Sequence, residues 1–245
     1  MDHIKDALQV NGLAIKRSLA SIRYLPIIWL VLFMTTVVTV LTNTLLSQFG
    51  LFNIPFVGGL IAYLIDVAMM SILAASLSSV IFGGNLTLQN FTAGWQRFIN
   101  PIMATRFIFW LIEMAIGLVI EPLFRPIAIL SMLLAYAIQI FKSPLLESIY
   151  IGGDAGQGVI YSIIDFLKNN FVQWIPIMVL FGFLSNILLG YITAGASLLS
   201  NWGLLIIFAG QSLLLAFTYI YKGHLYNILH DSNMRKRKFM GIFNE

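Results

Sequence analysis

Two acidic side chains lie deep inside long apolar segments, where a carboxylate could carry a proton or a cation. Asp66 lies nine residues after the start of one such segment, and Glu113 lies twelve residues after the start of the next. At 1.5 Å per helical residue these depths are about 13 Å and about 18 Å. Successive segments run in opposite directions across ~30 Å of hydrocarbon, so both acids come near one level. An acid at that depth costs roughly 2.5–3.5 kcal/mol to insert, which makes it a functional candidate.

Two neutral polar residues, Asn186 and Gln211, come close to the same level by the same counting. Together with Asp66 and Glu113 they form a polar layer near the middle of the membrane. Two acids that lie close together in a medium of low dielectric share one proton, so the layer predicts a proton or cation site. The alternative is structural, because a protonated acid can donate to Asn186, Gln211 or a backbone carbonyl and so fix the packing of the helices.

Small residues mark two faces on which helices can approach closely. Ser71, Ala75 and Ser79 recur at steps of four residues in one apolar segment, and Gly182, Asn186 and Gly190 do so in another. Such faces serve helix packing, either within one chain or between chains.

The elements that carry these residues belong to a membrane protein. Of the 245 residues 59% are hydrophobic and only 10% are charged, and the mean hydropathy is +0.90. A soluble domain has roughly 25% charged residues, so the composition excludes a soluble enzyme or a nucleic-acid-binding module. The chain has no cysteine, which excludes disulfides, thiolate metal sites and cysteine nucleophiles.

Six segments reach the length of about 20 residues that a membrane-spanning helix needs. We predict spans near residues 25–46, 57–82, 101–120, 126–141, 175–194 and 202–221. With six spans, 13 of the 14 basic residues lie on or near one side, and Arg125 lies on the other. The positive-inside rule therefore predicts that both termini are cytoplasmic. The basic run Arg235–Lys238 is interpreted as an anchor near anionic lipid, with no role in binding nucleic acid.

A repeat of about 75 residues is indicated by three prolines. Pro26, Pro101 and Pro176 are 75 residues apart, each is followed by isoleucine, and each follows an amphipathic segment. We predict three units, 8–82, 83–157 and 158–232, followed by a basic tail, 233–245. In each unit an interfacial helix is expected to precede a proline turn and two spans.

The segment Leu8-Gln9-Val10-Asn11-Gly12-Leu13-Ala14-Ile15-Lys16-Arg17 before the first span resembles the lead-in of YciC-like small bacterial integral membrane proteins. The resemblance covers about the first 45 residues and implies a polytopic membrane protein, in a family whose activity is largely unassigned. The topology, with residues 85–100 in place of a coupling helix, is also similar to that of ABC-2 type permeases.

Two other motifs do not meet the requirements of the sites that they resemble. Gly153 and Gly158 have the separation of a phosphate-binding loop, but Val159-Ile160 replaces the required Lys-Ser/Thr. His224 and His230 are six residues apart, which does not place two metal ligands on one helix face. We therefore expect no catalytic residues, no cofactor and no metal.

These patterns predict an all-α integral membrane protein of the plasma or inner membrane, with six spans as three hairpins and interfacial helices on the cytoplasmic side. The first functional hypothesis is a small permease or channel subunit that is not an enzyme, with Asp66 and Glu113 in its site. The alternative is a non-transporting accessory subunit of a larger complex or a lipid-organising protein. The expected partners are the lipid bilayer, anionic lipid at the basic face, and further subunits in a homo- or hetero-oligomer.

Overall fold

The computed structural model describes residues 2–51, 57–84, 88–116, 128–195, 201–230, 232 and 236–237. In these residues every regular element is a helix, which confirms the predicted all-α class. In chain order the elements are α1 (Asp2–Ala20), η1 (Ile22–Tyr24), α2 (Leu25–Gln48), α3 (Val57–Ile81), α4 (Leu88–Ala115), α6 (Ala128–Lys142), α7 (Leu145–Tyr150), α8 (Gln157–Gly195) and α9 (Asn201–Leu229).

Four stretches in the described part of the chain are long and apolar enough to cross a membrane, namely Ile22–Gln48, Val57–Ile81, Thr92–Ala115 and Gln157–Ile187. Only 11% to 39% of the residues in their most apolar windows are buried within the chain. Most of their apolar side chains therefore face outward, as lipid-facing side chains do. The other two predicted spans correspond to α6 and α9, which have 15 and 29 residues. The count of six spans stays a prediction.

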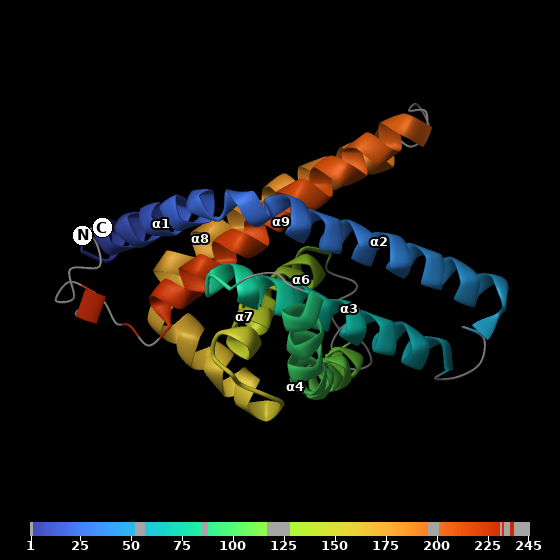
Figure 1. The fold of residues 1–245 in the computed structure, drawn as a ribbon, viewed down its shortest axis with the longest axis horizontal. Coiled ribbons are helices and arrows are strands. Elements are labelled where there is room, and N and C mark those ends of the chain that lie inside the picture. Colours follow the sequence, from blue (N-terminus) through green and yellow to red (C-terminus); the bar gives the residue numbers. More distant parts are fainter. Residues whose placement is uncertain are drawn as a thin grey trace.

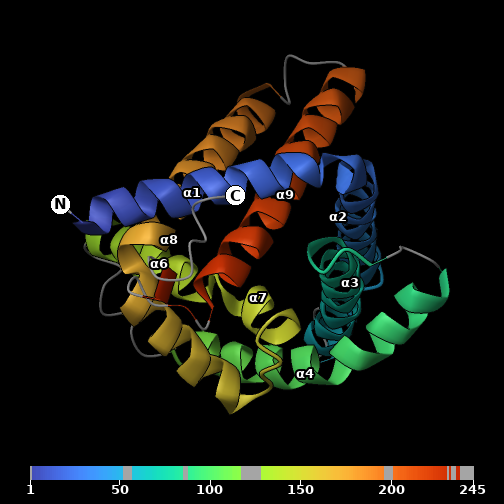
Figure 2. The ribbon, with the colours of Figure 1, turned by 60° about the vertical axis from the view of Figure 1, so that its left-hand side comes forward.

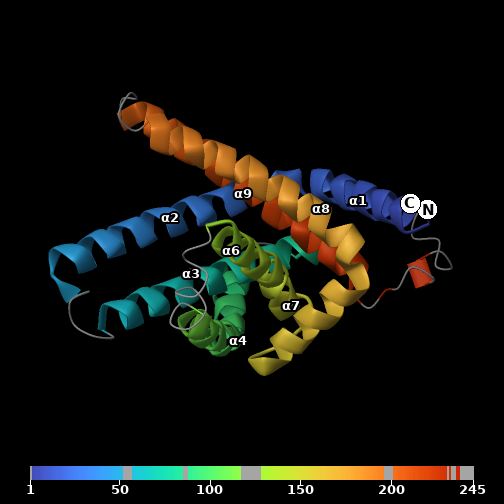
Figure 3. The same cartoon turned by 180° about the vertical axis from the view of Figure 1, so that it is seen from behind.

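Helix α2 and the α8–α9 pair extend away from α1. Figure 1 shows that the end of α2 and the tip of the α8–α9 hairpin point away from α1. Helix α1 lies across α8 and α9, as Figure 2 shows. Figure 3 shows α6 beside α8, and α7 below α6.

Only one of the three prolines stands at a helix start as predicted. Pro26 lies in the first turn of α2, after η1 has separated α1 from α2. Pro101 and Pro176, however, lie inside the long helices α4 and α8, so the expected proline turns are wrong at these two positions. Helix α8 breaks instead at Asn170 (φ −128°, ψ 22°).

The break at Asn170 has a local cause. The Asn170 side-chain Nδ2 donates to the Phe166 carbonyl at 3.1 Å, and this is the carbonyl that the Asn170 backbone N–H would bond in a regular helix. The side chain thus competes with the backbone N–H for this acceptor, which favours a bend of the helix at this position. The repeat units predicted at 8–82, 83–157 and 158–232 therefore differ in how the first helix joins the span, and the repeat stays a prediction.

Helix α1 uses two faces. Val10 and Ala14 are fully buried against α8 and α9. Leu8, Ile15 and Leu19, which belong to the apolar stripe expected at the membrane interface, are 70%, 43% and 51% exposed. An exposed apolar stripe on a helix that is held to the bundle by its other face is what an interfacial helix requires.

The small-residue face of α3 packs within the chain. Ser71 and Ala75 are buried, and Ser79 is half-buried. A Cβ added to Gly94 of α4 would lie 2.9 Å from the Ala75 Cβ, which is closer than van der Waals contact. The two helices therefore approach so closely because Gly94 has no side chain.

Candidate functional site

A cavity of about 540 Å³ with several polar side chains in its wall lies between α4, α6, α8 and α9. We call it the central cavity. Its charged lining residues are Arg106 of α4, Lys142 at the end of α6, and Lys222 of α9. The remaining polar and aromatic side chains in the wall are Tyr136, Gln139, Ser143, Phe181, Phe183, Ser185, Asn186, Thr218 and Tyr219. Among the described lining residues there is no carboxylate.

Each of the three cations is paired with an acid that does not line the cavity. Arg106 Nη2 donates to Asp66 Oδ2, and Lys142 Nζ donates to Glu113 Oε1. Lys222 Nζ lies 3.3 Å from Glu147 Oε1. The cations therefore face the cavity while their counter-ions lie outside its wall.

The structure connects most of the predicted polar layer to this cavity, but indirectly. Asp66 and Glu113 are 41% and 43% exposed and reach the cavity only through Arg106 and Lys142. Asn186 and Gly182 of α8 line it. Gln211 is half-buried in α9 outside the lining set, and nothing is described of the surroundings of Gly190.

The two predicted acids are thus each held by a different cation. Arg106 donates to Asp66 across the α3–α4 contact, although seven residues separate it from Glu113 along its own helix. Bound cations already balance both carboxylates, so the sequence-based hypothesis that these acids carry a proton or a cation has to compete with two ion pairs.

Glu147 is the acid that the sequence analysis missed. It lies on the short helix α7 and is completely buried. Neither of its carboxylate oxygens has a hydrogen-bond partner, and the contact with Lys222 is an ion pair without hydrogen-bond geometry. Burial raises the pKa of the Glu147 carboxyl, and the Lys222 ammonium and, to a smaller extent, the residue's own backbone N–H oppose this rise. A single acid in the apolar run Leu145–Tyr150 was the available sequence signal.

Aromatic side chains hold Lys222 in place between Glu147 and the cavity. Its Nζ lies 5.2 Å from the centre of the Tyr219 ring and 5.9 Å from that of Trp174. Trp174 is itself fixed, because its Nε1 donates to Ser143 Oγ at 2.7 Å. Rings beside an ammonium group stabilise its charged form. Lys222 is therefore a positioned cation with only 11% of its side chain exposed.

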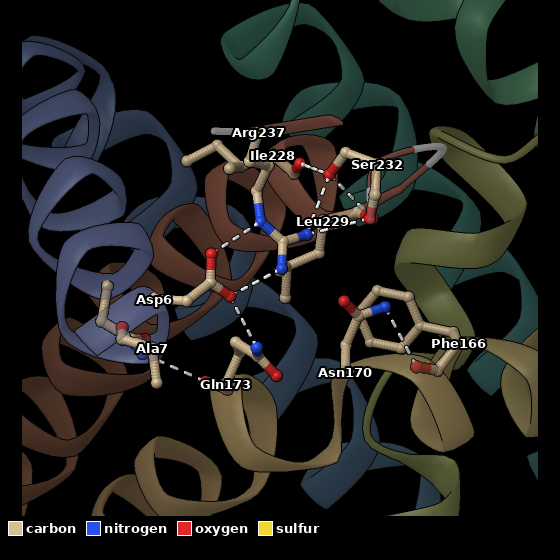
Figure 4. A network of polar contacts seen from close by, with 10 residues as sticks. Asp6, Ala7, Phe166, Asn170, Gln173, Ile228, Leu229, Ser232 and Arg237 are labelled. Atoms are coloured by element: carbon tan, nitrogen blue, oxygen red, sulfur yellow. Dashed lines mark hydrogen bonds and ion pairs between the residues drawn. The ribbon is translucent and has the colours of Figure 1, made fainter. Parts of the chain in front are cut away.

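A second polar network lies near the middle of α8, where Gln173 meets Asp6 of α1 and Arg237 (Figure 4). Arg237 Nη2 and Nε donate to the two oxygens of Asp6 at 2.7 and 3.2 Å, and Gln173 Nε2 donates to Asp6 Oδ2 at 2.7 Å. Asp6 and Arg237 are 2% and 1% exposed. The interpretation of the whole run Arg235–Lys238 as a lipid anchor is therefore wrong for Arg237, since its guanidinium is enclosed by protein.

The rejected motifs have structural roles in the described residues. His224 Nε2 is 2.8 Å from Ser21 Oγ, which ties α9 to the chain just before η1. Burial lowers the pKa of His224 to about 4, and the Arg17 charge adds to this effect. Gly153 and Gly156 have positive φ angles of 76° and 57° in the turn between α7 and α8. Among the described residues no group of three or more His, Cys, Asp or Glu side chains is placed to hold a metal ion.

Comparison of the chain with protein-family models, with curated proteins and with solved structures gives no match.

Proposed function

We propose that the chain is a small membrane permease whose central cavity binds an anionic solute with an apolar body. One observation carries the proposal: three cations line the central cavity, and their counter-ions lie outside its wall. Arg106 lies within a predicted span, and Lys142 and Lys222 directly follow the ends of two others. Charges inside or at the edge of the membrane that face a cavity are typical of substrate pathways. A wall of one sign raises the local concentration of solutes of the opposite sign.

The remaining lining suits an organic anion. Phe181, Phe183 and the ring of Tyr136 offer apolar contact, while Gln139 and Thr218 offer hydrogen-bonding groups. A pocket with an apolar wall and a few polar groups is typical of small-molecule sites. A cation, by contrast, would enter the field of Arg106, Lys142 and Lys222.

The contact between Asp6 and Arg237 supports an even number of spans. These residues lie near the two ends of the described chain, and their side chains are 2.7 Å apart. Both ends are therefore on one side of the bundle. We propose six spans, with α6 and α9 included. The first, third and fifth spans then each begin a hairpin on the cytoplasmic side. Both termini are cytoplasmic, as the distribution of basic residues predicts.

The proposal is tested by counterflow in vesicles. The full chain is reconstituted into phosphatidylcholine vesicles, and exchange of labelled benzenesulfonate, citrate and inorganic phosphate is measured against empty vesicles. The paired variant Arg106→Gln with Asp66→Asn removes one cavity cation without leaving an unpaired acid. We expect exchange of at least one of the three anions by the native chain, and its loss in this variant.

The matched control is Lys168→Gln, which removes an exposed lysine of α8 that does not line the cavity. It should exchange the anion at the native rate. Adding phosphatidylglycerol to the vesicles tests whether the occupant of the central cavity is a solute or a lipid headgroup. A headgroup that fills the cavity inhibits exchange of the solute.

Two outcomes would overturn the proposal. One is proton or cation flux that is lost in Asp66→Asn and Glu113→Gln but retained after the cavity cations are neutralised, which would return these acids to the role expected from the sequence. The other is the absence of exchange for all three anions by a folded chain. That result favours the accessory role, although the face of Ser71 and Ala75 is already occupied by α4 and is not available to a partner.

A further inference from the structure

The buried carboxylate of Glu147 is the least satisfied polar group near the central cavity. Its side chain is 0% exposed, and both oxygens lack a hydrogen-bond partner. Buried polar groups in proteins are nearly always hydrogen-bonded, so an exception calls for an explanation. The only charge that compensates this carboxylate in the described structure is Lys222 at 3.3 Å.

Lys222 lies between Glu147 and the central cavity. Its ammonium group contacts Glu147 on one side, and the residue lines the central cavity on the other. An anion in the cavity therefore competes with Glu147 for the same positive charge. Once the anion pairs with the Lys222 ammonium group, an ionised Glu147 would be a buried charge without compensation. Such a state is costly, and proteins avoid it by protonation of the acid.

We propose that Glu147 takes up one proton when an anion binds in the central cavity, so that the protein binds a proton and an anion together. The proton comes from a buffer acid in the surrounding solution, which is left as its conjugate base, and forms the O–H bond of the Glu147 carboxylic acid. Lys222 stays protonated and pairs with the anion. A monoanion and a proton then enter as a neutral pair. This inference rests on the proposed anion cavity.

The surroundings of Glu147 leave Lys222 as the group that decides its charge. On α7 the nearest titratable group is Tyr150, and on α9 they are Lys222 and Tyr219, with Tyr226 near Tyr150. The Arg106–Asp66 pair of α4 and α3 acts on Tyr219. From α8 the Trp174 ring lies against Lys222. Burial raises the pKa of Glu147, which brings the carboxyl closer to neutral pH, and the Lys222 charge holds it in the ionised state.

Coupling of this kind is reciprocal. If anion binding favours protonation of Glu147, then protonation must favour anion binding by the same factor. In the pH range between the pKa of Glu147 in the free protein and its pKa in the anion complex, the affinity should rise up to about tenfold for each unit by which the pH falls.

The test is isothermal titration calorimetry on the detergent-purified full chain with benzenesulfonate, an anion that stays deprotonated throughout the range. Titrations in two buffers with different enthalpies of ionisation give both the dissociation constant and the number of protons taken up. We expect close to one proton per anion for the native chain, and none for Glu147→Gln, whose affinity should no longer depend on pH. Asp165→Asn, which removes an exposed acid of α8, is the matched control and should behave as the native chain.

The outcomes separate this inference from the function on which it rests. If benzenesulfonate, citrate and phosphate all fail to bind, the anion cavity itself is refuted. If an anion binds without proton uptake by the native chain, only the role of Glu147 is refuted, and this measurement needs no variant to fold. Proton uptake that survives in Glu147→Gln but disappears in Glu113→Gln would also overturn the inference and assign the proton to Glu113.

Discussion

Removing Arg237 should release the start of α1 from the bundle without unfolding the spans. Arg237 gives Asp6 two hydrogen bonds, at 2.7 and 3.2 Å, and also donates to the Ser232 carbonyl at 2.9 Å. In Arg237→Ala the Asp6 carboxylate keeps only the bond from Gln173. Breaking a buried pair in this way costs about 3–5 kcal/mol, because one charge is left without its partner.

The lower end of this range applies here, since Gln173 still compensates part of the Asp6 charge. A loss of about 3 kcal/mol corresponds to a change of roughly 10² in the equilibrium for local opening. Hydrogen exchange measures that equilibrium for each amide. We therefore expect the amides of residues 5–10 to exchange roughly 10² times faster in Arg237→Ala. Amides near Ala14 should change less, because Val10 and Ala14 remain packed against α8 and α9.

The control is Lys168→Ala, which removes an exposed lysine of α8. It should leave exchange in α1 unchanged. The double variant Asp6→Leu with Arg237→Met should regain most of the protection, because replacing a buried pair by apolar residues is often neutral or stabilising. Equal exchange in the native chain and Arg237→Ala, or equal effects of Arg237→Ala and Lys168→Ala, would refute the reasoning.

Two further predictions concern α9. The folded state disfavours protonation of His224, whose pKa falls from 6.5 to about 4. The unfolded chain therefore binds the proton first, so the thermal midpoint should fall as the pH drops from 6.5 toward 4, and it should fall less in His224→Gln. A methyl group at Gly223 would lie 2.5 Å from Tyr150 Oη and 2.7 Å from Ile81 Cδ1. Gly223→Ala should thus destabilise the chain by about 1–3 kcal/mol in denaturant titrations, whereas Gly12→Ala, with nothing within 4 Å of the new Cβ, should stabilise α1 by up to about 1 kcal/mol. Equal midpoints for the two glycine variants would contradict the close approach of α9 to α3 and α7.

The local features of the sequence predicted the helices well, because lipid makes hydropathy a strong signal. An apolar run of sufficient length has to form a helix in the membrane, since every backbone group must be bonded within its own segment. Ile22–Gln48 and Val57–Ile81 coincide with predicted segments for this reason, whereas Thr92–Ala115 and Gln157–Ile187 begin nine and 18 residues before the predicted starts and overlap those segments only in part. The N-terminal amphipathic helix was also visible, as its apolar stripe is exposed in the fold.

Proline positions were a weaker signal than their equal spacing indicated. A proline removes one backbone donor and can stand either at a helix start or within a long helix that tolerates the loss. Pro26 took the first position, while Pro101 and Pro176 took the second. The break in α8 came from Asn170, whose side chain bonds the Phe166 carbonyl. Such a bond depends on a rotamer that sequence spacing does not determine.

The partners of the charged side chains could not be predicted, because they follow from how the helices cross. Depth along a helix places Asp66 and Glu113 at similar levels, but it says nothing about which helix each acid faces. In the fold the cations Arg106 and Lys142 reach them across helix contacts. Arg106 thus bonds an acid 40 residues away rather than one on its own helix.

The position of Glu147 shows why burial is a better guide to this site than membrane depth. Asp66 and Glu113 are acids within apolar segments, yet each is half-exposed and paired with a cation, so its charge is already balanced. Glu147 lies outside the predicted spans, but it is fully buried, and its ionised form depends on one lysine that also faces the cavity. A group whose charge is balanced by one shared partner must respond when that partner is engaged elsewhere. Of the acids connected to the cavity, Glu147 is therefore the one whose protonation an incoming anion can change.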